Sequence, residues 1–471
     1  MPMLDDFFSK LSTLAGGVST DHLKMIFTLL ASYPVALIYK RLPHNPNLKH
    51  LFSIIIAIIV LFEVFDLSNA FYVMLGGSLI SYAIIYFVKG VWGPRLVFLY
   101  ALGHLSINHI YRQFNHITYD KYDTTGPQMV LVIKLTSFAF NVFDGRRPNK
   151  ELTPYQRSKA ITSMPSILEY LGYIFFFGGF MVGPAFEFMD YRQFTNMEMF
   201  RVDEKTKNHL QLKPLQLVNE HFNKKSDNVT GGPIKYYVPN GMIPAMCKLG
   251  FASFCARLKY YIVWLLAEGA CILSGLGFNG YDDHGNAKWN RVTNVDIIAY
   301  ETADNIKSLL DTWNMNTNKW LKNYVYLRVT PPGKKPNFFS TIATFGTSAI
   351  WHGFYPGYYL TFISGAFVQS VHRTLRRNIR PIFLTPKFSS LKPLYDFFGW
   401  LFTQTMIHYV VIPFNILSLR NTLTIWKSLY FYGHVAIILV NAAFWLGKVA
   451  INETGIPLEF DNSSVCLEKE E

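Results

Sequence analysis

Residues 340–362 read STIATFGTSAIWHGFYPGYYLTF, a run without Asp, Glu, Lys or Arg that is long enough to enter a lipid bilayer. His352 lies near the middle of this run. Ionisable side chains at membrane depth are rare and usually functional. Imidazole has an unperturbed pKa of about 6.5, which suits proton transfer at neutral pH. The run therefore predicts a membrane-embedded segment that carries a candidate general base.

The whole chain has the composition of a membrane protein. Of its 471 residues, 50% are hydrophobic, 16% are aromatic and 16% are charged. A soluble domain carries about 25% charged residues. Apolar runs extend from one end to the other, so we expect a single membrane-embedded domain over residues 1–471. Within it we expect a peripheral loop region at 187–241 and a polar C-terminal tail at 448–471.

The apolar runs predict an all-α polytopic membrane protein with about eleven transmembrane or re-entrant helices. Several runs are shorter than the ~20 residues of a simple span, or contain Gly and Pro. Such segments are tolerated in a bilayer only where protein or water covers the backbone. The candidate runs are 25–39, 51–67, 70–88, 96–111, 128–143, 168–186, 258–278, 340–354, 357–371, 394–415 and 428–447.

The net charge of +13 indicates loops that attract anionic headgroups and anionic ligands. No basic helix or aromatic ladder of a nucleic-acid module is present in the sequence, so we expect no nucleic-acid partner. The basic run HRTLRRNIR at 372–380 has two interpretations, a positive-inside anchor or a contact with a lipid headgroup or a cofactor phosphate. The four cysteines are scattered and predict neither a disulfide framework nor a metal site.

A second informative stretch, TWNMNTNKWLKNYVYLR at 312–328, predicts one helix with an apolar-aromatic stripe. Asn314 and Asn318 are four residues apart, so they would share a face of that helix. The sequence PPGKKP at 331–336 predicts the end of the helix. Asn314 and His352 are separated by 38 positions, too many for one helix face, so the fold would have to bring them together.

These two stretches resemble the signature pair of the membrane-bound O-acyltransferase (MBOAT) family. The second matches the WHGxxxGYxxxF motif of the lysophospholipid acyltransferase branch of that family. The resemblance is clearest from about residue 168 to 435 and is closest to the fungal broad-specificity lysophospholipid acyltransferases. The segments that carry it are WNMNTNKWL at 313–321, WHGFYPGYYLTF at 351–362, AEGAC at 267–271, SGLGF at 274–278, GPAFEFMDY at 183–191 and YFYGH at 430–434.

The resemblance implies helices around a central reaction chamber and direct transfer of an acyl group from acyl-CoA to a lysophospholipid hydroxyl. Lysophosphatidylcholine and lysophosphatidylethanolamine would be acceptors, and diacyl phospholipids would be products. His352 would be the general base. Asn314 would donate a hydrogen bond either to the hydroxyl or to the developing oxyanion, and both roles stay open. Acyl-CoA is then a co-substrate, no cofactor or metal is expected, and the protein would be a multi-pass component of the endoplasmic reticulum membrane.

The resemblance also suggests side chains that contact the two substrates. Glu268 lies in an apolar helix, where a structural pairing role and a proton-handling role are both possible. The expected substrate contacts are Trp313, Asn318, Trp320, Trp351, Tyr355, Tyr358, Glu268 and His434. The expected contacts with acyl-CoA phosphates are Lys319, Lys322, Arg328, Lys334 and Lys335.

Two alternatives remain at this point. The acceptor could be diacylglycerol, a sterol or a protein hydroxyl. However, the FYxDWWN element of the sterol and diacylglycerol branch is absent from the sequence, and the protein-acylating branch sometimes has Asp where this chain has Asn314. The chain could instead be a lipid or proton transporter that uses His352 as a relay. Transporters often show internal repeats, and the sequence shows none.

Overall fold

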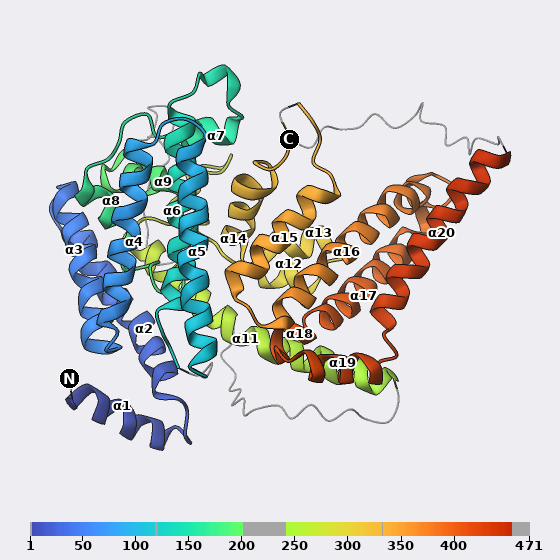
Figure 1. Ribbon diagram of the computed structural model, residues 1–471, viewed down its shortest axis with the longest axis horizontal. Helices are drawn as coiled ribbons and strands as arrows, with labels where there is room; N and C mark the ends of the chain where they lie inside the picture. The colour runs from blue at the N-terminus through green and yellow to red at the C-terminus, as the bar shows by residue number, and fades with distance from the viewer. Residues whose placement is uncertain (1, 118–120, 201–241, 332, 455–471) are drawn as a thin grey trace.

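The computed structural model describes residues 2–117, 121–200, 242–331 and 333–454, and these ranges are built from helices (Figure 1). The first group of helices is α1 (Pro2–Leu14), α2 (Thr20–Arg41), α3 (Pro46–Ile59), α4 (Ser68–Phe87), α5 (Trp92–Phe114), α6 (Thr125–Gly145), α7 (Pro154–Lys159), α8 (Ile167–Ile174) and α9 (Phe188–Thr195). The second group is α12 (Ile297–Glu301), α13 (Ile306–Thr312), α14 (Met315–Trp320), α15 (Phe338–His352), α16 (Pro356–Ile379), α17 (Lys392–Val410), α18 (Ile412–Ile416), α19 (Leu419–Ser428) and α20 (Tyr432–Thr454). Between the groups lies α11 (Met242–Ser274).

Short helices of other types complete the fold. Val60–Val64 (η1) and Leu321–Tyr326 (η5) are π-helical continuations of α3 and α14. The 3₁₀ turns are η2 (Asn149–Glu151), η3 (Glu198–Phe200), η6 (Arg380–Leu384) and η7 (Ser389–Leu391). Within the described ranges, strand pairing is limited to one isolated bridge between Tyr281 and Ala287. The predicted all-α class is therefore confirmed.

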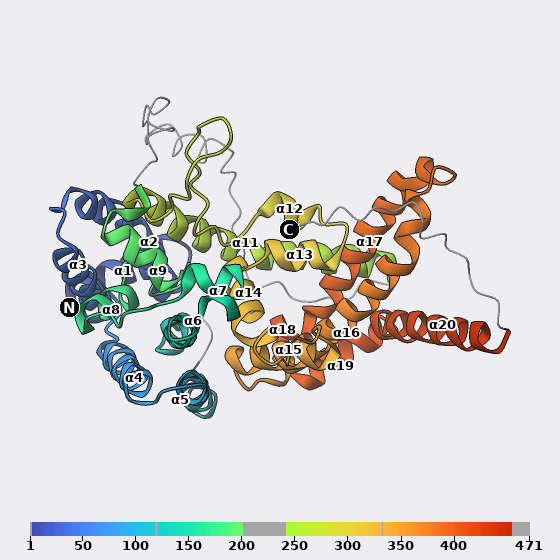
Figure 2. The ribbon, with the colours of Figure 1, turned by 90° about the horizontal axis from the view of Figure 1, so that it is seen from above.

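The long helix α11 connects the two groups, and Figures 1 and 2 show it running from one to the other. Near its start, Ala245 and Leu249 are buried in a core formed with α13, α16, α17 and α19. Near its end, Ala267 and Cys271 are buried in the larger core of the first group. One continuous helix thus contributes to both hydrophobic cores and links them.

Helix α6 lies at the centre of the first group, beside α4 and α5 (Figure 2). Its apolar stretch is 83% buried inside the protein, against 28–39% for the other candidate membrane spans. Leu135, Phe138 and Val142 are almost completely inaccessible. A helix covered on all sides by protein provides a rigid frame for its neighbours, and both signature stretches pack against it, as described below.

Six helices of the described ranges are long and apolar enough to cross a membrane, and a seventh span is possible if α19 and α20, bent by 71°, are counted as one. The expected number of about eleven is not confirmed. Several predicted runs are helical but not simple spans. For example, α15 has 15 residues, and the 168–186 run contains only the eight-residue α8. The last turns of α16 are rich in arginine, which lowers its hydropathy.

The expected peripheral regions are described in part. Residues 188–195 form α9, in which Phe188, Tyr191 and Phe194 are buried in the first core. Helix α20 continues to Thr454 and therefore extends into the expected tail. The remainder of the loop region, residues 201–241, and of the tail, residues 455–471, lies outside the described residues.

Candidate active site

His352 is the last residue of α15, at the turn of a helical hairpin. The hairpin starts where the Asn337 side chain caps α15 by accepting a hydrogen bond from the Ser340 N–H at 3.2 Å. Gly353 has a φ of +121°, which a residue with a Cβ rarely adopts, and it ends the helix. Pro356 then starts α16 at a position where its missing N–H is not needed. The motif therefore places His352 at a turn rather than along a helix face.

Aromatic rings surround the His352 imidazole. The ring of Phe362 stacks on it with centroids 5.1 Å apart, Phe414 lies edge-on at 5.0 Å, and Tyr358 lies at 5.5 Å. The imidazole makes no hydrogen bond to a protein group in the described ranges. Apolar walls with available ring nitrogens suit a base that takes its proton from a substrate hydroxyl.

His109 of α5 supports the same turn. Its Nε2 lies 3.1 Å from the Trp351 carbonyl oxygen, which can only accept, so the imidazole donates. The His109 ring also covers Gly353 so closely that a Cβ there would lie 3.3 Å from the ring. The sequence shows His109 as one more histidine in an apolar run, and its contact with a residue 242 positions away carries no local signal.

The prediction of one helix over 312–328 is wrong. Trp313 is extended at the end of α13, and Asn314 adopts a left-handed conformation with φ of 43° before α14 begins. Asn314 is thus the N-cap of α14, and the expected shared face with Asn318 does not form. Asn318 instead donates to Asp311 at 3.2 Å.

The side chain of Asn316, which the sequence did not indicate as a functional residue, holds the chain in this break between α13 and α14. Its side-chain amide donates to the carbonyl oxygen of Thr293 at 3.3 Å and to Oδ1 of Asn294 at 3.1 Å. Thr293 in turn donates to Glu268, which is buried in α11. Glu268 thus accepts a hydrogen bond from the loop that Asn316 also contacts. The run of alternating asparagines at 314, 316 and 318 was the only available signal for Asn316.

Tryptophans join the two signature stretches. The rings of Trp320 and Trp351 have centroids 6.1 Å apart. Both indoles donate to α6, Trp320 to the Thr136 hydroxyl at 2.8 Å and Trp351 to the Met129 carbonyl at 2.9 Å. Both rings are at most 5% exposed, so packing accounts for them without a substrate. The third tryptophan, Trp313, lies in a separate aromatic group formed with Tyr260, Tyr261, Trp264 and Tyr300.

His434 lies apart from these groups, at the bend between α19 and α20. Its Nδ1 is 2.6 Å from the Tyr409 hydroxyl, and its ring packs against Trp426 with centroids 4.6 Å apart. Tyr355 borders the hairpin turn, with its ring 6.4 Å from that of Tyr358. The structure therefore groups Trp320, Trp351, Tyr355 and Tyr358 around the hairpin and places His434 apart from them.

The five predicted phosphate contacts fall into two kinds. Lys319, Lys322, Lys334 and Lys335 are exposed. Arg328 is half-buried and forms an ion pair with Asp144, which is completely buried at the end of α6. The four lysines form no ion pair in the described ranges, whereas Arg328 already has a protein partner.

A buried polar network near Arg328 was also not foreseen. The Glu187 carboxylate accepts from Asn141 Nδ2 at 2.7 Å and from the Tyr155 and Tyr324 hydroxyls, both at 2.9 Å. These residues come from α6, α7, η5 and the start of α9. The network holds η5, which follows the Asn314 break, against the central helix.

Gly357 of the signature motif is required by packing, which gives a direct prediction. A Cβ at Gly357 would lie 2.1 Å from the Pro413 carbonyl oxygen of α18. We expect Gly357→Ala to destabilise the protein by about 1–3 kcal/mol and to slow its reaction, because α16 must move away from α18. Thermal unfolding and activity of the purified protein measure both effects. Gly346→Ala in α15 is the matched control, since a Cβ there meets nothing within 4 Å. Equal unfolding midpoints for the two variants would contradict the argument.

An all-helical membrane protein that holds a histidine in an aromatic site at an interior helical turn has the features of an integral-membrane enzyme. The model of the membrane-bound O-acyltransferase family, MBOAT, matches residues 110–224 and 229–412 of the chain. The chain belongs to this family and is an acyltransferase, as the sequence predicted.

Curated relatives cover most of the chain. A lysophospholipid acyltransferase of Schizosaccharomyces pombe is 41% identical over 91% of this chain and 87% of the relative. A lysophospholipid acyltransferase of Saccharomyces cerevisiae is 39% identical over 89% of this chain and 73% of the relative. Human membrane-bound glycerophospholipid O-acyltransferase 2 is 34% identical over 77% of this chain and 72% of the relative. The similarity extends well beyond the motifs and includes fungal relatives, in agreement with the predicted branch.

Proposed function

We propose that this protein transfers an acyl group from acyl-CoA to the free hydroxyl of a lysophospholipid and so forms a diacyl phospholipid, in the endoplasmic reticulum membrane. The main support for the proposal is the environment of His352. Its imidazole lies among aromatic rings at the hairpin turn and forms no hydrogen bond with a protein group in the described ranges. The names of the fungal relatives support the lysophospholipid as acceptor.

The chemistry of the transfer follows from the reacting groups. A glycerol hydroxyl is a poor nucleophile until a base takes its proton. In the proposed reaction His352 accepts that proton while the oxygen attacks the thioester carbonyl carbon. The new C–O ester bond forms, the C–S bond breaks, and the CoA thiolate leaves and recovers the proton. Asn314 donates its amide N–H to the acceptor hydroxyl or to the oxyanion.

Binding of both substrates is assigned to the surroundings of the hairpin. Both substrates carry acyl chains, which gain about 0.8 kcal/mol for each CH₂ removed from water, so an apolar wall such as Phe362 and Phe414 favours them. Tyr355 and Tyr358 are the proposed polar contacts beside His352. The exposed lysines Lys319, Lys322, Lys334 and Lys335 are the proposed contacts for the CoA phosphates.

An acceptor panel tests the proposal. Membranes that contain the protein are supplied with labelled oleoyl-CoA and, in turn, with lysophospholipids of different headgroups, diacylglycerol and cholesterol. We expect labelled diacyl phospholipid from at least one lysophospholipid and no product above that of protein-free membranes from diacylglycerol or cholesterol. Labelled triacylglycerol or sterol ester as the only product would replace the proposed acceptor with another one.

A further inference from the structure

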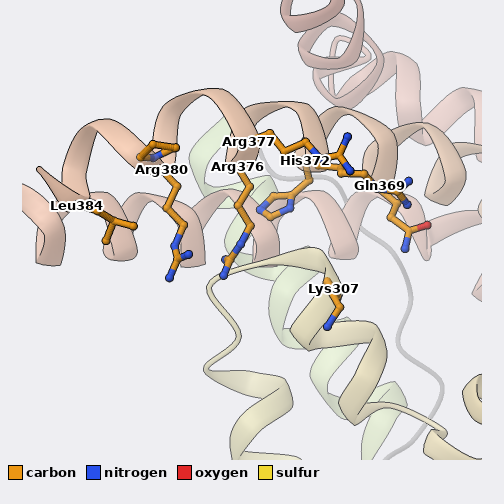
Figure 3. Close-up of a pocket in the computed structure, with 9 residues that line it drawn as sticks. Lys307, Gln369, His372, Arg376, Arg377, Arg380 and Leu384 are labelled. Carbon is orange, nitrogen blue, oxygen red and sulfur yellow. The ribbon is translucent and has the colours of Figure 1, made fainter. Parts of the chain in front are cut away.

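A basic pocket of about 310 Å³ lies at the far end of α16 from His352. Figure 3 shows Arg376 and Arg380 extending toward the segment that carries Lys307, with His372 beside them. The lining contains four arginines, one lysine and no carboxylate. Its residues are Lys307, Gln369, His372, Arg373, Arg376, Arg377, Arg380, Pro381 and Leu384.

The four arginines of the pocket are spaced as one face of a helix. Positions 373, 376, 377 and 380 follow the pattern i, i+3, i+4, i+7, which places the side chains next to one another. Like charges at these spacings destabilise a helix by about 0.2–0.5 kcal/mol for each pair. An anion bound between the guanidinium groups would relieve this mutual repulsion.

In the described part of the protein, no carboxylate lies within ion-pair distance of these arginines. None of the four arginines forms an ion pair or a side-chain hydrogen bond within the described ranges, and Arg373, Arg376 and Arg380 are half-buried. The nearby acidic groups are otherwise engaged, since Asp311 pairs with Lys307 at 3.1 Å and Asp396 pairs with Lys392 at 2.5 Å. Asp304 is the remaining carboxylate in the vicinity and accepts from the Asn305 amide.

The surface beside the pocket is apolar and exposed. It continues into Ser389–Ile416, one of the candidate membrane spans. A row of guanidinium groups next to an exposed apolar surface is the arrangement expected at the headgroup level of a membrane. The exposed residues are Leu384, Leu391, Leu394, Phe397 and Phe398.

We infer that this pocket binds the phosphate monoester of an anionic membrane lipid at a site separate from the reaction centre. A phosphate monoester carries a charge of about −1.5 to −2 and three acceptor oxygens, which guanidinium groups bind in a bidentate manner. Arg376 lies 20 residues after Pro356, about 30 Å along α16 from the hairpin turn. The bound lipid is therefore not the acceptor at His352, and the inference does not depend on the proposed acceptor.

The test measures binding of dioctanoyl phosphatidic acid to the purified full-length protein in detergent by calorimetry. We expect Arg373→Gln/Arg376→Gln to weaken binding by at least about tenfold, because two charge-assisted contacts are lost. The matched control is Lys40→Gln/Arg41→Gln, which removes two exposed positive charges at the end of α2. There we expect a change of less than about twofold. Equal weakening by both pairs would show general electrostatic attraction and overturn the inference.

Additional binding measurements identify the kind of molecule that supplies the phosphate. Dioctanoyl phosphatidylcholine has the same chains without a monoester, and we expect it not to bind. Inorganic phosphate and CoA are added as competitors. CoA could displace the bound lipid at concentrations near the dissociation constant of CoA itself, and this displacement could be absent in Arg373→Gln/Arg376→Gln. That result would make the pocket a nucleotide site and overturn the lipid assignment.

Arg376→Lys keeps the charge and the fold but loses the bidentate fork, so we expect it to weaken lipid binding several-fold. If Arg376→Lys binds the lipid as tightly as the wild type, the inference is also overturned.

Discussion

Replacing His352 by alanine is expected to lower the rate of acyl transfer by about 10²–10⁴-fold, the usual contribution of a general base. The imidazole is the only ionisable group of the hairpin turn at 351–358 whose ordinary pKa lies near neutrality. Its removal leaves the aromatic walls in place, because Phe362, Phe414 and Tyr358 also contact one another. The substitution should therefore lower the reaction rate and leave the fold and the substrate affinity largely unchanged.

Two further variants separate proton transfer from packing in this experiment. His352→Gln keeps a polar side chain but cannot accept a proton from a hydroxyl, so its rate should be as low as that of His352→Ala. His104→Ala removes another histidine, from α5, and should retain most of the activity. The measurement is product formation from labelled acyl-CoA and a lysophospholipid, normalised to folded protein. Wild-type rates in both His352 variants would refute the assignment of His352 as the base.

The sequence predicted the helical class well, because that class depends on local features such as long uncharged apolar runs. It did not predict that the run around His352 folds into a hairpin with His352 at its turn. It predicted the Asn314 region poorly. Helical periodicity suggested one helix, whereas hydrogen bonds from Asn316 to a loop more than 20 positions earlier hold the chain in a break. Such long-range pairing leaves no trace in the spacing of apolar residues.

The same limit explains the number of spans and the role of Arg328. Helix α5 is rich in polar residues and fails as a simple span by hydropathy, although it packs along α6. Arg328 follows Lys319 and Lys322 in a basic stretch, so it was assigned to the phosphates together with these lysines. Its partner, Asp144, lies 184 positions away, and only the folded chain reveals the pair.

Replacing Arg328 by glutamine is expected to destabilise the protein by about 3 kcal/mol, because it leaves the fully buried Asp144 carboxylate without its main partner. Arg328 Nη1 donates to Asp144 Oδ1 at 2.9 Å, and its guanidinium group stacks 4.7 Å above the Phe140 ring. Arg147, with its own contact to Asp144 at 3.5 Å, compensates only in part. The midpoint of thermal unfolding should fall clearly, while the KM for acyl-CoA of the folded fraction should stay unchanged.

The controls for this prediction distinguish structure from substrate binding. Lys322→Gln removes an exposed positive charge from the same segment and should change the stability by no more than about 0.5 kcal/mol. The double variant Arg328→Gln/Asp144→Asn removes both charges and should recover part of the lost stability, since no unpaired carboxylate remains buried. A raised KM for acyl-CoA in Arg328→Gln with an unchanged unfolding midpoint would instead support the phosphate contact predicted from the sequence. Arg328 would then have to leave Asp144 when the substrate binds.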